Sequence, residues 1–67
     1  MILIVNGIKQ EFDKQKISVT EMLKELNYTF PIIVVKHNEI VVENRDFDDY
    51  MLKDGDEINV LHIFAGG

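Results

Sequence analysis

The last stretch of the chain reads EINVLHIFAGG over residues 57–67. Its run of alternating and β-branched apolar residues predicts a β-strand over 57–64, which continues to Phe64 without a polar spacer. Glycine suits positions where a backbone must enter a tight cleft or approach another backbone. We therefore expect residues 65–67 to form a flexible tail that presents the α-carboxylate of Gly67. The alternative is an ordinary frayed terminus.

Strand periodicity assigns the side chains of this stretch to two faces. Ile58 and Val60 share the face predicted to meet the helix, whereas Leu61 and Ile63 lie on the other face. Together with Phe64, these two aliphatic residues predict a docking patch for a partner beside the tail. Ordinary scatter of exposed apolar side chains is the alternative.

The first element is a predicted β-hairpin. Asn6-Gly7 separates two strand-like runs, about 2–6 and 8–13, and this dipeptide favours a two-residue turn with positive φ at both positions. The continuous apolar run Ile2–Val5 predicts a strand buried on both faces and therefore central in the sheet.

One amphipathic helix is predicted over residues 19–27. Ser18 and Glu21 form a capping-box pattern, and Asn27 is a plausible stop. We expect the apolar stripe of the helix to pack in the core rather than bind a partner. The stripe consists of Val19, Met22, Leu23 and Leu26.

Shorter elements fill the rest of the chain. The pattern predicts, in order, a strand over 32–35 after Pro31, a turn over 36–39, a strand over 40–42, a helical turn that packs Phe47, Tyr50 and Met51 inward, and a turn over 53–56 with Gly55 at positive φ. This order predicts an α+β domain over 1–64, with a mixed sheet of four to five strands and one helix on one face. The first and last strands are the most apolar, so we expect them to be parallel neighbours in the centre.

Composition limits the function classes. The chain has 67 residues, no cysteine and a formal net charge of −5. This charge argues against nucleic acid as a partner, and no apolar run approaches the roughly 20 residues of a membrane span. The acidic balance permits a basic protein partner, although solubility alone accounts for it. Without cysteine or a signal-peptide pattern, we expect a cytoplasmic protein.

No catalytic or metal-binding constellation is predicted. His37, interpreted as a turn residue, and His62, interpreted as a partly buried strand residue, lack companion ligands. The acidic stretch around Asp48 lacks the glycine and glutamate spacing of a calcium loop, and no glycine-rich loop fits a phosphate. The acidic residues, interpreted as a solvated face, are Asp46, Asp48 and Asp49; the hydroxyl residues interpreted as helix caps without a catalytic base are Ser18 and Thr20.

Three features together resemble a known family. They are Asn6-Gly7 in the first hairpin, the segment 52–56 (Leu-Lys-Asp-Gly-Asp) before the last strand, and the terminal pair Gly66-Gly67. The chain resembles the ubiquitin-like sulfur carriers, and most closely the thiamine-biosynthesis (ThiS-like) carriers. The resemblance implies a β-grasp fold and a protein co-substrate rather than an enzyme.

The resemblance also implies a chemical role for the tail. A ThiF-like activating enzyme would adenylate Gly67 with ATP, a sulfur donor protein would convert it to a thiocarboxylate, and a ThiG-like thiazole synthase would receive the sulfur. The carrier itself would bind no cofactor. Gly66 and Ala65 would thread into the partner's cleft, while Leu61, Ile63 and Phe64 would dock.

Other functions remain open at this stage. A carrier with the same chemistry could supply sulfur for molybdopterin synthesis. A ubiquitin-like modifier would instead be conjugated to other proteins through Gly67. A plain interaction module with an inert tail is the third possibility.

Overall fold

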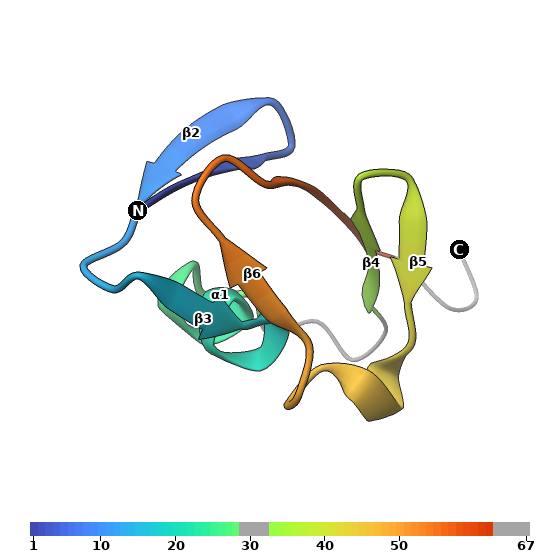
Figure 1. Ribbon diagram of the computed structural model, residues 1–67. Coiled ribbons are helices and arrows are strands. Elements are labelled where there is room, and N and C mark those ends of the chain that lie inside the picture. Colours follow the sequence, from blue (N-terminus) through green and yellow to red (C-terminus); the bar gives the residue numbers. More distant parts are fainter. Residues whose placement is uncertain (29–32, 63–67) are drawn as a thin grey trace.

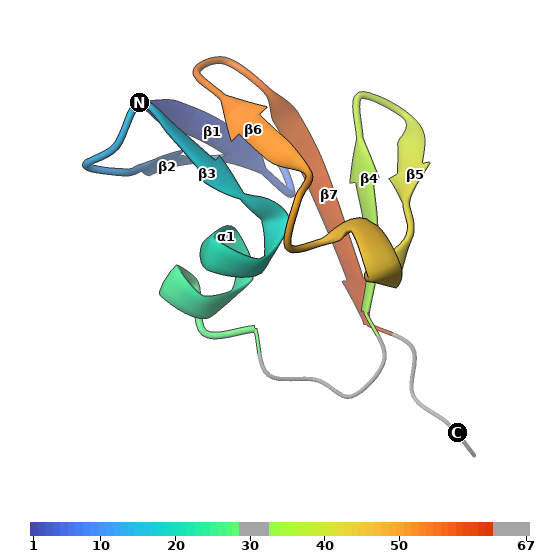
Figure 2. The ribbon, with the colours of Figure 1, turned by 60° about the horizontal axis from the view of Figure 1, so that its bottom comes forward.

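The computed structural model describes residues 1–28 and 33–62. A two-stranded sheet pairs β3 with β6 (Figure 1), and a five-stranded mixed sheet has the strand order β2-β1-β7-β4-β5 (Figure 2). The elements are β1 (Ile2–Val5), β2 (Ile8–Glu11), β3 (Lys16–Ser18), α1 (Val19–Glu25), β4 (Ile33–His37), β5 (Ile40–Val42), the 3₁₀ turn η1 (Asn44–Asp46), β6 (Met51–Lys53) and β7 (Glu57–His62). The predicted mixed sheet with one helix on one face is confirmed.

The first hairpin forms as predicted. Asn6 and Gly7 have φ values of 52° and 80°, the left-handed conformation that the two-residue turn requires. The Asn6 side chain also extends the contact between β1 and β7, because its Oδ1 accepts from the Val60 N–H at 2.8 Å and its Nδ2 donates to the Val60 carbonyl at 3.3 Å. Both strands end earlier than predicted, at Val5 and Glu11.

β1 and β7 are parallel neighbours within the sheet, as predicted. The prediction that β1 is buried on both faces is wrong. Leu3 and Val5 are fully buried, but Ile2 is 41% exposed and Ile4 is only half-buried. The apolar run was a misleading signal, because the helix and the small sheet cover only one face of the large sheet. Alternate residues of β1 therefore stay accessible.

The helix begins at the predicted capping box. The Glu21 N–H donates to Ser18 Oγ at 3.1 Å, and the Glu21 side chain accepts from the Ser18 N–H. The Lys14 ammonium, 2.9 Å from the Glu21 carboxylate, lowers the pKa of that exposed carboxyl. The helix ends at Glu25, slightly before the predicted end, and Asn27 follows at a φ of 61°.

The pairing of β3 with β6 was not predicted. Ile17 pairs with Leu52, and both side chains are fully buried. The predicted inward packing is confirmed for Phe47 and Tyr50, which lie half-buried against the core, but it is wrong for Met51, which is 45% exposed. Met51 belongs to a strand rather than a helical turn, and strand alternation turns Leu52 inward in its place.

The segment after residue 32 also differs from its prediction. β4 continues through His37, so the predicted turn over 36–39 is confined to Asn38 and Glu39, which have φ values of 48° and 74°. Gly55 has the predicted positive φ, at 87°. The buried side chains form one cluster between the large sheet, α1 and the small sheet. In residues 1–28 and 33–62, no helix has the length and apolar character needed to span a membrane.

The side chain of His37, at the end of β4, contacts the residues that directly precede β6 and β7. Its Nε2 lies 3.0 Å from Asp56 Oδ2, and its Nδ1 lies 2.8 Å from the Tyr50 hydroxyl. Asp56 is buried and also accepts from the Lys53 N–H at 2.9 Å. The interpretation of His37 as a turn residue is wrong, because it is the last residue of β4 and its side chain links this strand to Tyr50, just before β6, and to Asp56, just before β7.

We predict that Asp56→Ala lowers the free energy of unfolding by about 2 kcal/mol, because it leaves the partly buried Lys53 N–H and the His37 ring without their acceptor. Urea denaturation measures the change. Asp49→Ala is the matched control: this exposed aspartate should change stability by no more than about 0.5 kcal/mol. Equal unfolding midpoints for the Asp56 and Asp49 variants would contradict a stabilising role for the link.

Candidate docking face and C-terminal tail

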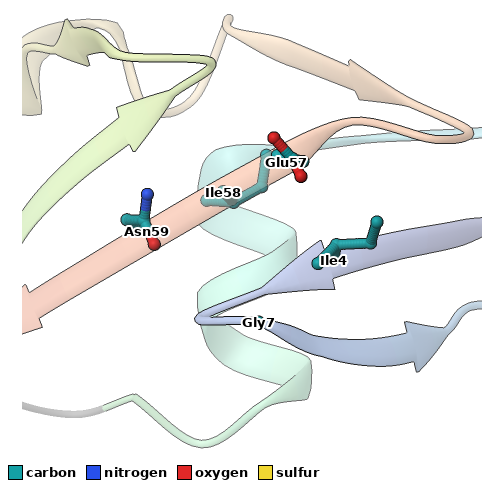
Figure 3. A pocket seen from close by; sticks show the side chains of 5 residues that line it. All are labelled: Ile4, Gly7, Glu57, Ile58 and Asn59. Atoms are coloured by element: carbon teal, nitrogen blue, oxygen red, sulfur yellow. The ribbon is translucent and has the colours of Figure 1, made fainter.

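Within residues 1–28 and 33–62, the large sheet has one face that no helix covers. Ile58 and Val60 of β7 are buried at 1% and 3% exposure, so Glu57, Asn59 and Leu61 lie on the opposite face, here called the open face. Figure 3 looks onto this face, with α1 behind the sheet. The predicted parity of the last strand is thereby confirmed over the residues that the structure describes.

Apolar side chains gather on the open face near the end of β7. Leu61 is 50% exposed and lies directly opposite the half-buried Val34 of β4. Val41 of β5 is 56% exposed and lies opposite Lys36. Of the predicted docking residues, the structure places Leu61 on the surface, whereas Ile63 and Phe64 lie outside the described residues.

A shallow hollow lies at the other end of the open face. It is lined by Ile4, Gly7, Glu57, Ile58 and Asn59 (Figure 3). Glu57 stands directly opposite Ile4, and its carboxylate forms no ion pair within residues 1–28 and 33–62. Leu61 is the fourth residue after Glu57, roughly 13 Å further along the strand. The open face thus carries a polar end and an apolar end.

The predicted tail continues from the apolar end. β7 runs the length of the sheet, and its carboxyl end lies on the side away from Met1 (Figure 2). His62 is a strand residue, as predicted, whereas its predicted partial burial lies outside what the structure describes. The candidate tail residues Ala65, Gly66 and Gly67 also lie outside the described residues, so the division into a 1–64 domain and a 65–67 tail stays a prediction.

The structure also describes the hydroxyl and acidic residues that were singled out from the sequence. Ser18 caps α1, but Thr20 does not: its hydroxyl donates to Asp48 and so connects α1 to the loop after η1. Asp46 and Asp49 are exposed. Within the described part of the chain, no three His, Cys, Asp or Glu side chains lie close enough together to hold a metal ion.

Sequence reasoning missed three members of the open face that lie on neighbouring strands: Val34, Lys36 and Val41. Their common face depends on which strands are neighbours and in what register, which local alternation does not specify. A predicted strand longer by two residues than 32–35 would have placed Lys36 on the same face as Val34. This alternation was the signal in the sequence that could have found Lys36.

A model of the ThiS family matches residues 3–67, almost the whole chain. The chain belongs to the ThiS family. A crystal structure of a thiamine biosynthesis protein (ThiS) from Geobacter metallireducens is 35% identical, with a TM-score of 0.88 and complete coverage of both chains. An NMR solution structure of a thiamine biosynthesis protein from the same organism gives a TM-score of 0.80 at 35% identity, covering all of this chain and 88% of the other. A search of curated proteins found no match.

ThiS membership confirms the β-grasp fold and the resemblance inferred from the sequence. ThiS proteins are small sulfur carriers rather than catalysts, so the chain is a carrier protein. The family and the structural neighbours support a sulfur-carrier role in thiamine biosynthesis.

Proposed function

We propose that this chain carries sulfur as a thiocarboxylate on Gly67 and delivers it for formation of the thiazole of thiamine. The observation that carries the proposal is the ThiS family match, which extends through Gly67. The position of the strand end supports the proposal, because β7 ends at His62, one residue after the exposed side chain of Leu61.

The chemistry needs an activated acyl group. A carboxylate is a poor acyl donor, so a ThiF-like enzyme first joins the Gly67 carboxylate to the AMP portion of ATP and releases pyrophosphate. A sulfur nucleophile from a persulfide donor protein then attacks the acyl carbon, and AMP leaves. This forms an acyl disulfide between Gly67 and the donor cysteine. A second cysteine thiol then attacks the sulfur of the donor cysteine, so that a protein disulfide forms and the Gly67 thiocarboxylate leaves. A ThiG-like thiazole synthase receives the sulfur.

The carrier contributes placement rather than catalytic side chains. Docking of the open face converts the attack on Gly67 from a bimolecular encounter into a local reaction. Residues 65–67, when extended, span about 10 Å, which allows the end group to enter a cleft while the globule stays outside. We propose that Ala65 and Gly66 thread this cleft and that Leu61, Ile63 and Phe64 dock. These reactions would take place in the cytoplasm.

The first step has a direct test. A ThiF-like enzyme incubated with labelled pyrophosphate and ATP should exchange the label into ATP only when this chain is present, because adenylation of Gly67 is reversible. We expect the exchange rate to rise with carrier concentration and then saturate. No exchange above the enzyme-only rate at any carrier concentration would contradict the proposed function.

A further inference from the structure

Lys36 differs from the other basic residues of the protein. All seven Lys and Arg residues lie in the described part of the chain, and Lys36 alone among them is half-buried. It stands on the open face of β4, directly opposite Asn59 of β7 and Val41 of β5. The six exposed residues are Lys9, Lys14, Lys16, Lys24, Arg45 and Lys53.

The described part of the chain does not neutralise the charge of Lys36. In residues 1–28 and 33–62, its ammonium has no hydrogen-bond or ion-pair partner. Lys14 and Arg45, in contrast, lie 2.9 Å and 2.8 Å from carboxylates. Half-burial without an ion pair is typical of a lysine whose methylene stem covers neighbouring apolar surface while its ammonium stays in water.

A protein that covers Leu61 would also cover Lys36. Leu61 is opposite Val34, and Val34 and Lys36 are alternate residues on the same face of β4, roughly 7 Å apart along the strand. Removing water from an ammonium group is costly unless the partner supplies an anionic group with good geometry. A purely apolar partner surface would therefore dock poorly here.

We propose that the activating enzyme places a carboxylate against Lys36 when it binds the open face. This inference rests on the proposed function. We assign the carboxylate to the activating enzyme because Gly67 must be adenylated before any other protein can receive sulfur. A single cation flanked by Val34, Val41 and Asn59 gives both specificity and orientation, because a surface without the matching carboxylate leaves the cation desolvated and unpaired.

The test measures the affinity of a ThiF-like enzyme for the wild-type chain and three variants by calorimetry. Lys36→Met keeps the stem but removes the charge, and it should weaken binding about tenfold; Lys36→Glu should weaken it about a hundredfold. Lys24→Glu, on the exposed side of α1, makes the same change in net charge away from the open face and should stay within about twofold of wild type.

Salt dependence provides a second readout, because a merely structural role for Lys36 would not change it. Wild-type binding should weaken as ionic strength rises, and binding by Lys36→Met should weaken less. Unaltered or tighter binding by Lys36→Met would overturn the inference, as would equal losses for Lys36→Glu and Lys24→Glu, which would indicate a net-charge effect. If the wild-type chain supports pyrophosphate exchange and Lys36→Met binds with wild-type affinity, only this inference fails. If wild type neither binds nor supports exchange, the proposed function fails with it.

Discussion

Removal of Gly67 is expected to abolish ATP–pyrophosphate exchange while leaving the melting temperature unchanged. The shortened chain still ends in a carboxylate, on Gly66, but that group is displaced by about 3.5 Å, the span of one extended residue. A displacement of even 1 Å from the reactive geometry costs about a hundredfold in rate, so a whole residue should eliminate activation. The exchange assay and a thermal melt by circular dichroism measure the two effects separately.

The matched control for this deletion is Gly67→Ala, which keeps the chain length. Its exchange should exceed that of the deletion, because the carboxylate reaches the same depth, and fall below that of wild type, because the added methyl group widens the terminal residue. A deletion variant that exchanges at the wild-type rate would contradict a role for Gly67. A large drop in its melting temperature would contradict a tail that is separate from the folded body.

Leu61→Glu is expected to weaken binding of the activating enzyme by about 2 kcal/mol, a factor of about 30, with little effect on folding. Leu61 is 50% exposed on the open face, so an interface centred there would lose apolar contact and gain a desolvated charge. The free energy of unfolding should change by no more than about 0.5 kcal/mol, because the side chain is not part of the core. Calorimetry and urea denaturation measure binding and stability.

Met51→Glu is the matched control for Leu61→Glu. Met51 is also an apolar strand residue of similar exposure, at 45%, but it belongs to β6 of the small sheet rather than to the open face. It should bind the enzyme as wild type does. Equal binding losses in the two variants, or a stability loss at Leu61 as large as its binding loss, would contradict the assignment of the docking face.

The features predicted correctly from the sequence are those set by short-range chemistry. Asn6-Gly7 determines its turn through backbone conformation, and Ser18 and Glu21 determine the helix start through mutual hydrogen bonds. Alternation placed Ile58 and Val60 inside and Leu61 outside. The parallel contact of β1 with β7 also followed, because the two most apolar strands favour the centre of a sheet.

The features that were missed depend on contacts between distant residues. β3 and β6 have three residues each, too few to show a period, and they become strands only by pairing with each other. The link from His37 to Asp56 likewise joins residues far apart in the chain. The position of Lys36 on the open face, opposite Asn59 and without an ion pair in the described residues, became apparent only from the register of β4 and β7. Local sequence contains no information on such pairings.

The most direct test of the account is the intact mass of the chain after incubation with ATP, a ThiF-like enzyme and a persulfide sulfur donor. The account predicts a mass increase equal to the replacement of one oxygen by sulfur, located by fragmentation at Gly67. An unchanged mass in a mixture that performs pyrophosphate exchange would contradict the thiocarboxylate. Covalent attachment of Gly67 to lysines of other proteins, without any sulfur-containing product, would indicate a modifier instead.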